Sequence, residues 1–375
     1  MMEKRRKTIL FVCAILLVIG SSYASDENTT VYIAKQCENN IVIWNYKSGE
    51  VETIHFPELN GIERIKASQD GKMLYFDSRE RTTNTCDLIA YDLIKGSYKK
   101  ISLNDYGIIR VSDIEINKDE LWVSAQWDER PTTGGVNGIS YIVIIDLKKF
   151  EVTDIIESDT YFASLAFSKD NKKAYISTFL IYHGGGAFTH NNEVLVYSVK
   201  TRNLLLSIPV GVEGFDCLGD ITEGTKDNII VACRRSGRLA VIDTKKDVLL
   251  FEGQVPPFSS YYDLGYITSS QRYNYLFVAS SGAPEIGVFD LETLTYIQGI
   301  PLASNYDWNI SGSVDNKEEY VIQYGNYWNE WPAPHYNRIE LYDIETLSFS
   351  GIELDFGQGN TMHCYGNLSV ASKKK

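Results

Sequence analysis

The stretch Leu239–Asp243, LAVID, decides the fold, because the chain repeats it in seven versions. Each version has several apolar residues and a polar end, usually Asp, followed by a turn and a second apolar segment. The seven copies are IVIWN (Ile41–Asn45), LIAYD (Leu88–Asp92), IVIID (Ile142–Asp146), VLVYS (Val194–Ser198), LAVID (Leu239–Asp243), IGVFD (Ile286–Asp290) and IELYD (Ile339–Asp343). Their polar ends are 47, 54, 52, 45, 47 and 53 residues apart, which indicates a regular structural repeat.

Each repeat predicts four strands, which we name a to d in chain order. In the second repeat they are Arg64–Ala67, Met73–Asp77, Leu88–Asp92 and Tyr98–Leu103, and the turn Ser68–Gly71 joins the first two. Asp-Gly between apolar alternations is a hairpin signal. Repeats of this length with four short strands are typical of a β-propeller. We therefore expect an all-β fold, a seven-bladed β-propeller with four-stranded antiparallel blades.

The two ends of the chain together make one repeat. Asp343 is followed by 32 residues, and Ser25 to Asn45 adds 21, which is one repeat length in all. The N-terminal part lacks a strand a, and the C-terminal part has a spare strand around Thr361–Tyr365. We expect N- and C-terminal strands to share blade 1 and close the ring, because closure removes open sheet edges.

The segments that contain strand c and the following turn resemble those of a known family. Val241–Thr244 (VIDT) and Val288–Thr293 (VFDLET) resemble the repeats of seven-bladed β-propellers of the YVTN type. The resemblance covers residues 29–372 and implies a secreted or cell-surface protein. Propellers of this kind include lactonase-like enzymes and the large subunits of periplasmic amine dehydrogenases, besides many with no known activity. The chain has no motif specific to one of these, so no functional residues are carried over.

The first 24 residues have the pattern of a signal peptide. Lys4–Lys7 is positively charged, Thr8–Gly20 is apolar, and Ser22–Ala24 is a small-residue cleavage site. The apolar run has 13 residues, whereas a membrane span needs about 20. We expect cleavage before Ser25, one propeller domain over residues 25–375, and a periplasmic, secreted or cell-surface location. The alternative is a leader retained as an anchor.

The charge of the chain restricts its partners. The whole sequence is −13, and the leader carries four basic residues and one acidic residue, so the mature chain is −16. Phosphate binding needs a basic surface, which argues against a nucleic-acid partner and against anionic lipid. A cationic ligand would fit this charge.

Five cysteines remain after leader removal, and exported proteins form disulfides. Cys217 and Cys233 flank a predicted hairpin of blade 5, and Cys37 and Cys364 hold the corresponding places in blade 1. We expect these two disulfides, with buried free thiols as the alternative. Cys86 is left over and could be a free thiol or an intermolecular link.

Function is expected where the repeat is violated, since the regular part builds the scaffold. Blades 3, 4 and 7 insert residues between strands b and c, and in an up-down blade the b–c and d–a connections emerge on one face, here called the top face. Aromatic, histidine and charged residues gather in these connections, which predicts a ligand-binding surface. The candidates are Trp127, Asp128, Arg130, Tyr161, His183, His190, Tyr261, Tyr262, Asp263, Tyr306, Trp308, Trp328, Trp331 and His335. The alternative is that these rings only fill the channel mouth or pack the loops together.

The candidates predict binding more directly than catalysis. The spacing of His183, His190 and His335 is not diagnostic of a metal site, no metal site is predicted, and the cofactor is unknown. We expect an exported binding protein that holds a small molecule, glycan, peptide or protein on the top face, as a monomer or in a hetero-complex. The alternative is an enzyme, either a lactonase-like hydrolase using these histidines or an amine-dehydrogenase large subunit with a cofactor-bearing partner.

Overall fold

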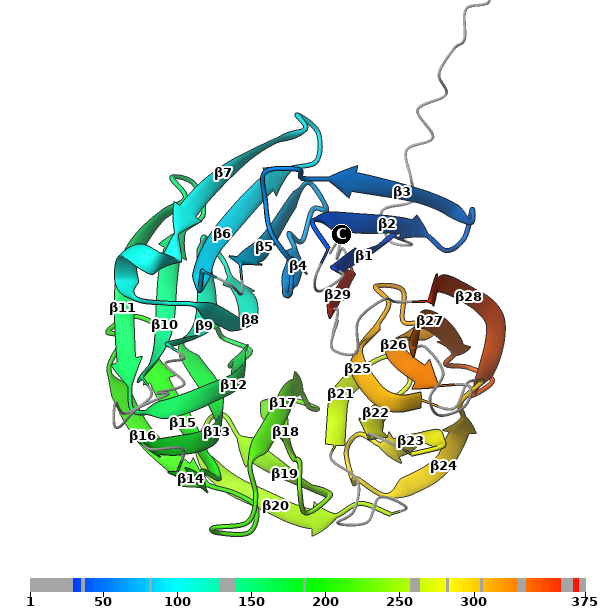
Figure 1. Cartoon of the computed structure of the whole chain (residues 1–375). Coiled ribbons are helices and arrows are strands. Elements are labelled where there is room, and N and C mark those ends of the chain that lie inside the picture. Colours follow the sequence, from blue (N-terminus) through cyan, green and yellow to red (C-terminus); the bar gives the residue numbers. More distant parts are fainter. Residues whose placement is uncertain are drawn as a thin grey trace, which may run out of the picture.

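The chain forms a ring of seven four-stranded antiparallel blades around a central axis, as a computed structural model shows (Figure 1); we call the region that the innermost strands enclose the channel. The structure describes residues 30–34, 38–80, 83–127, 139–184, 187–256, 264–280, 283–303, 306–328, 335–358 and 367–370. No helix in these ranges is long and apolar enough to span a membrane. The predicted all-β seven-bladed propeller is confirmed.

Blades 1 to 3 contain the following strands, from the channel outward. Blade 1 has β29 (Asn367–Val370), β1 (Thr30–Ala34), β2 (Asn40–Asn45) and β3 (Glu50–His55). Blade 2 has β4 (Ile65–Ala67), β5 (Met73–Glu80), β6 (Thr85–Asp92) and β7 (Ser97–Ser102), followed by a 3₁₀ helix over Leu103–Tyr106. Blade 3 has β8 (Arg110–Asn117), β9 (Glu120–Trp127), β10 (Ile139–Asp146) and β11 (Glu151–Ser158).

Blades 4 to 7 repeat this order. Blade 4 has β12 (Thr160–Phe167), β13 (Lys173–Gly184), β15 (Glu193–Ser198) and β16 (Leu204–Pro209), with β14 (Ala187–His190) paired to β13. Blade 5 has β17 (Leu218–Glu223), β18 (Asn228–Cys233), β19 (Arg238–Asp243) and β20 (Val248–Gln254). Blade 6 has β21 (Leu264–Ser270), β22 (Tyr275–Ser280), β23 (Glu285–Asp290) and β24 (Tyr296–Pro301). Blade 7 has β25 (Tyr306–Val314), β26 (Tyr320–Trp328), β27 (His335–Asp343) and β28 (Ser348–Gln358).

The polar residue that ends each repeated unit makes the c–d turn. Asp92 Oδ1 accepts the backbone N–H groups of Ile94 at 3.0 Å and Lys95 at 2.9 Å. The same pair of bonds recurs at Asp146, Asp243 and Asp290, and at Asn45 in blade 1. A short side chain that accepts from the backbone two and three residues later is what a tight turn requires. This explains why six of the seven repeats end in Asp or Asn; in blade 4 the Ser198 hydroxyl accepts the N–H of Thr201 instead.

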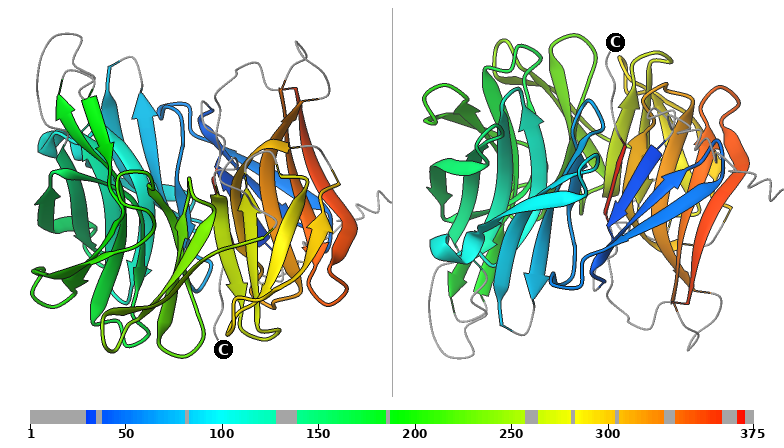
Figure 2. Two further views of the ribbon diagram at one scale, coloured as in Figure 1. Left: turned by 90° about the horizontal axis from the view of Figure 1, so that it is seen from below. Right: turned by 90° about the horizontal axis from the view of Figure 1, so that it is seen from above.

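Apolar side chains fill the spaces between neighbouring blades. The described residues form seven buried clusters, one at each of the seven blade interfaces. Phe56 and Phe76, for example, pack between blades 1 and 2 with their ring centres 5.2 Å apart. Seen edge-on, the blades stand side by side around the disc (Figure 2). Each blade is therefore held mainly by its two neighbours.

Strand β29 closes the ring by pairing with β1, where Tyr32 lies opposite Ser369. The prediction that the two ends share blade 1 is confirmed. The strand that closes the ring covers Asn367–Val370, and the predicted segment Thr361–Tyr365 lies outside the described residues. In this register Leu368 is buried against blade 7 residues.

The described parts of the insertions of blades 4 and 7 extend strands. In blade 4, Tyr182 pairs with Phe188 in an additional hairpin. In blade 7, β26 and β27 remain paired as far as Trp328 and His335. Bulky residues adjoin each insertion, as in Phe179–Tyr182 and Tyr327–Trp328, and such residues favour continued strand pairing.

Removal of β29 should destabilise the whole ring. A chain ending at Gln358 loses the strand that pairs with β1, so we expect its thermal unfolding midpoint to fall by at least roughly 5–10 °C. The matched control ends at Val370 and keeps every described contact, so it should melt with the full chain. Equal melting of all three chains would contradict closure by β29.

Candidate binding site at the channel mouth

The structure describes the predicted site residues unequally. Six of them lie outside the described residues, namely Asp128, Arg130, Tyr261, Tyr262, Asp263 and Trp331. Six others have a described backbone, within strands that reach the top face, and no described side chain, namely Trp127, His183, Tyr306, Trp308, Trp328 and His335. The remaining two, Tyr161 and His190, are described in full. The aromatic surface as a whole therefore stays a prediction.

The two fully described candidates are already engaged within the fold. Tyr161 is only 8% exposed, so its ring packs inside the protein rather than facing a ligand. His190 Nε2 lies 2.5 Å from a guanidinium nitrogen of Arg235. Since a guanidinium only donates, Nε2 must accept, and the imidazole is neutral in this contact. A role of His190 in ligand binding stays a prediction.

The expected disulfide between Cys217 and Cys233 is absent, and both are buried thiols. Cys233 pairs across the hairpin with Leu218, the residue after Cys217. Because side chains alternate along a strand, Cys217 and Cys233 project to opposite faces. Cys86 is also a buried thiol, and burial raises its pKa. Cys37 and Cys364 lie outside the described residues.

Polar side chains on the innermost strands join neighbouring blades inside the channel. Each accepts a hydrogen bond from a backbone N–H of the next blade. In the described contacts, Ser369 Oγ accepts from Ala67 N at 3.0 Å and Asp113 Oδ2 accepts from Leu165 N at 2.9 Å. Asp220 Oδ2 accepts from Ile267 N at 3.3 Å, and Thr268 Oγ1 accepts from Val314 N at 3.2 Å. The channel wall is thus connected by polar bonds, whereas the spaces between blades are apolar.

Asp113 and Asp220 also meet at one hydroxyl. Ser164 Oγ lies 2.8 Å from Asp113 and 3.2 Å from Asp220. A serine has one hydroxyl proton and cannot donate to both carboxylates, so a proton on Asp220 would satisfy the second contact. Burial, followed by the charge of Asp113, raises the pKa of Asp220 to about 7. Asp220 therefore gains or loses its proton near neutral pH.

A second group of charges lies where blade 2 meets the top face. Asp77 Oδ1 accepts the backbone N–H groups of Glu63 at 3.1 Å and Arg64 at 2.6 Å, which fixes the connection leading into β4. Burial and the neighbouring Glu63 raise the pKa of Asp77 to about 7. Glu63 lies between two guanidinium groups, 3.6 Å from Arg79 and 3.8 Å from Arg110. The buried carboxylates are thus partly neutralised by a proton and partly by arginine.

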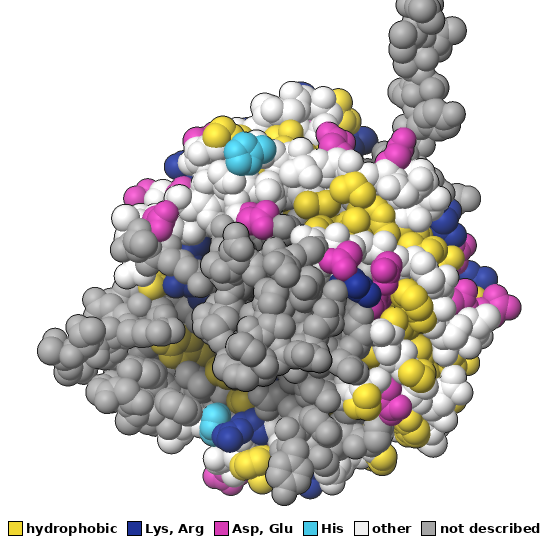
Figure 3. Space-filling model, turned by 45° about the vertical axis from the view of Figure 1, so that its right-hand side comes forward, with side chains coloured by type: hydrophobic (Ala, Val, Ile, Leu, Met, Phe, Trp, Pro, Cys, Tyr) yellow, Lys and Arg dark blue, Asp and Glu magenta, His cyan; other side chains and the backbone are white. Residues whose placement is uncertain are grey.

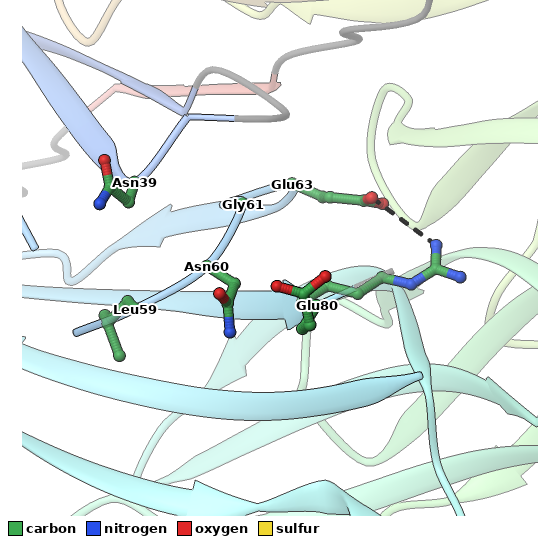
Figure 4. A pocket seen from close by; sticks show the side chains of 7 residues that line it. Asn39, Leu59, Asn60, Gly61, Glu63 and Glu80 are labelled. Carbon is green, nitrogen blue, oxygen red and sulfur yellow. Dashed lines mark ion pairs between the residues drawn. The ribbon is translucent and has the colours of Figure 1, made fainter. Parts of the chain in front are cut away.

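These residues border a cavity of about 430 Å³ between blades 1 and 2. Its lining consists of Asn39, Leu59, Asn60, Gly61, Glu63, Arg79 and Glu80. Figure 4 shows Glu63 directed at the Arg79 guanidinium, with Asn39 and Asn60 on the same cavity. The Arg79 separation exceeds hydrogen-bonding distance, and its buried Nε has no hydrogen-bond partner among the described residues. The cavity therefore presents amide, carboxylate and guanidinium groups that could bond to a ligand.

The lining of the cavity carries both signs of charge, with Glu63 and Glu80 beside Arg79. In Figure 3 the coloured acidic side chains are scattered among Lys and Arg over the visible surface. No group of three His, Cys, Asp or Glu residues in the described ranges is arranged to hold a metal ion. The described cavity suits a polar ligand with both donors and acceptors.

Comparison with known proteins supports the fold. No family model matches the chain, and no curated protein matches it. Solved structures do match. A chain of "Crystal Structure of Mitotic Checkpoint Complex" has a TM-score of 0.58 at 12% identity, over 79% of this chain and 81% of that one. "Crystal structure of RRP9 WD40 repeats" gives 0.57 at 10%, over 79% and 83%, and "Structure of U3-55K" gives 0.56 at 10%, over 81% and 89%.

The channel acids and the cavity were not among the sequence-based candidates. Asp113-Ile114 and Asp220-Ile221 occupy corresponding places within strand a, at its register shift, in blades 3 and 5. Aligning the repeats would reveal this shared Asp. The cavity depends on Asn39, Gly61 and Arg79, which come from three separate segments. No local sequence pattern connects them.

Asp220 should make stability depend on pH. In the folded chain it keeps its proton up to about pH 7, whereas an unfolded Asp loses it near 3.8. The folded state then holds more protons between these values, so its stabilising contribution is complete below about pH 4 and is lost as pH rises to about 7. We expect Asp220→Asn to flatten this part of the curve of unfolding free energy against pH, measured by urea denaturation.

Asp146→Asn is the matched control for this experiment. The pKa of Asp146 is lowered by backbone hydrogen bonds in its turn, so its contribution changes at more acidic pH. Parallel curves for the wild type and Asp220→Asn between about pH 5 and pH 7 would contradict a protonated Asp220.

Proposed function

We propose that the chain is an exported binding protein that holds a segment of a protein partner at the channel mouth on its top face. The cavity lined by Asn39, Asn60, Glu63 and Arg79 carries this proposal. Amide side chains both donate and accept, and the Glu and Arg groups are of opposite charge, which suits the N–H and C=O groups of a peptide. The size of the cavity, about 430 Å³, fits one or two residues of such a segment.

Further apolar contact is available elsewhere on the top face. Phe215 and Val212 lie in the d–a connection before β17 and are 40% and 38% exposed. The Arg235 guanidinium lies 5.1 Å from the Phe215 ring centre. Exposed aromatic rings beside arginine are frequent in protein interfaces. We infer that a partner crossing the channel mouth would meet both the polar cavity and this apolar patch.

The likeness to WD40-repeat structures agrees with a role in protein interaction. The identities are 10–12%, so the likeness concerns the fold, and the partner is inferred from the cavity alone. The YVTN type and the predicted aromatic surface belong to the same proposal. A binding surface on blades 3, 4 and 7 would extend the site around the ring.

Substitution of Arg79 should weaken peptide binding. Peptides selected from a displayed random library on the immobilised chain serve as the probe, with affinity measured by titration calorimetry. Loss of a charged hydrogen bond costs about 1.5–3 kcal/mol, so Arg79→Ala should raise Kd roughly 10- to 150-fold. Asn60→Ala, which leaves the ion pair with Glu63 intact, should raise it less.

Lys72→Ala is the matched control for peptide binding. Lys72 lies in the exposed a–b turn of blade 2, at the opposite end of β5 from the cavity. The proposal fails if the selected peptides bind Arg79→Ala and Lys72→Ala as tightly as the wild type.

Export can be tested separately from binding. A cleaved signal peptide predicts that intact-mass measurement of the cell-expressed protein gives a chain beginning at Ser25. The protein should then be found outside the cytoplasm by fractionation. A mass that includes residues 1–24 would favour the anchor instead.

A further inference from the structure

The outer strands of the blades differ in a way that the binding site does not explain. Every blade ends in a strand whose outer edge is paired with no described strand. The outer strands of blades 1, 2 and 3 carry exposed charges such as Glu52, Lys99 and Asp154. Charged side chains on an edge strand prevent unwanted association. Blades 4, 5 and 6 lack this protection over much of the strand length.

A β-bulge recurs in these outer strands, and its residue is polar in blades 3 and 7 but apolar in blades 4, 5 and 6. In blade 3 the bulged residue is Thr153, and in blade 7 the irregular segment contains Ser350. Their hydroxyls bond back to the carbonyls of Ile144 and Leu341. In blades 4, 5 and 6 the bulged residues are Leu205, Leu250 and Ile297, which are 48%, 52% and 44% exposed.

Neighbouring residues enlarge the apolar surface. We define the apolar belt as Leu204, Leu205, Val248, Leu249, Leu250, Phe251 and Ile297, which lie on β16, β20 and β24. Figure 1 shows these three strands in succession along the lower rim of the ring. A Cβ added at Gly253 would lie 2.5 Å from Phe251 Cζ, so the Phe251 ring lies over Gly253. Blade 5 thus carries the centre of the belt.

We propose that the apolar belt is the interface of a symmetric dimer, in which it packs against the same belt of a second copy of this chain. Of the 12 large apolar residues that are exposed in the described ranges, seven belong to the belt. The other five, Val51, Ile94, Tyr106, Val212 and Phe215, are spread over blades 1, 2, 4 and 5. The belt thus holds most of the exposed large apolar side chains of the described residues, and a two-fold contact uses it on both sides.

The size of the belt and the charges beside it agree with a second copy of the chain as its partner. Seven side chains at about half exposure supply roughly 500–700 Å², near the ~800 Å² that each partner buries in a standard interface. Lys200 and Lys246 are exposed before β16 and β20, and Glu213 is exposed beyond the end of β16. A two-fold axis perpendicular to these strands sets them antiparallel, so Lys200 before β16 of one copy faces Glu213 beyond β16 of the other. The bulges interrupt the strand edges, so the contact is made by side chains.

Sedimentation velocity of the chain beginning at Ser25 tests this proposal. We expect a concentration-dependent dimer for the wild type and at least a 100-fold higher dimer Kd for Leu250→Lys, which would bury a charge. Val51→Lys is the matched control, since Val51 is 50% exposed on the outer strand of blade 1, and it should dimerise like the wild type. Circular dichroism melting confirms that each variant is folded.

Mixing two variants tests the symmetry. If Leu250 lies beside its two-fold mate, an equimolar mixture of Leu250→Lys and Leu250→Glu should form dimers that neither variant forms alone. A mixture that stays monomeric overturns the symmetric contact. A wild type that is monomeric at every concentration overturns the dimer. Co-flotation of the wild-type monomer with phosphatidylcholine vesicles also overturns it, because lipid would then cover the apolar belt. None of these outcomes depends on Arg79 or on peptide binding.

Discussion

The antiparallel pairing of β29 with β1 is the contact on which the ring depends. Each blade is covered on both faces by its neighbours, and the apolar clusters between blades form one closed series. Leu368 takes part in the cluster between blades 7 and 1, and the Ser369 hydroxyl reaches the backbone of blade 2. One short strand thus connects three blades. In the closed ring of seven blades, no blade has an uncovered face.

The channel wall follows a different principle from the spaces between blades. Its innermost strands carry Ser, Thr and Asp, which accept backbone N–H groups of the next blade. A buried N–H needs an acceptor, and a carboxylate supplies a strong one. The cost is that Asp113 and Asp220 are brought close together, which raises the pKa of Asp220 to about 7. The same solution recurs at Asp77, which fixes the connection bordering the cavity.

The sequence was sufficient to predict the architecture because the decisive signal is repeated. Asp92, Asp146 and Asp243 each form the same turn, so a strand that is ambiguous in one repeat can be assigned from the others. The strand Asn367–Val370 was not predicted, since a single four-residue strand has no such support. The Cys217–Cys233 prediction failed because it depended on a one-residue register. The cavity could not be predicted, because Asn39, Gly61 and Arg79 meet only after blades 1 and 2 have packed.

The shared blade also has a consequence for the order in which the chain can fold. Strands β1 to β3 leave the ribosome first, but their sheet is complete only when Asn367–Val370 has been made. At about 5–20 residues per second, the first hairpins of the chain wait roughly 15–70 s for the strand that covers their inner edge. During this interval blades 2 to 7 can form from contiguous sequence, whereas blade 1 depends on a contact more than 300 residues away. Such a distant contact adds little entropy cost over a shorter one, because the cost of closing a loop grows only with the logarithm of its length. Its effect is on timing, and an incomplete chain remains an open arc until synthesis ends.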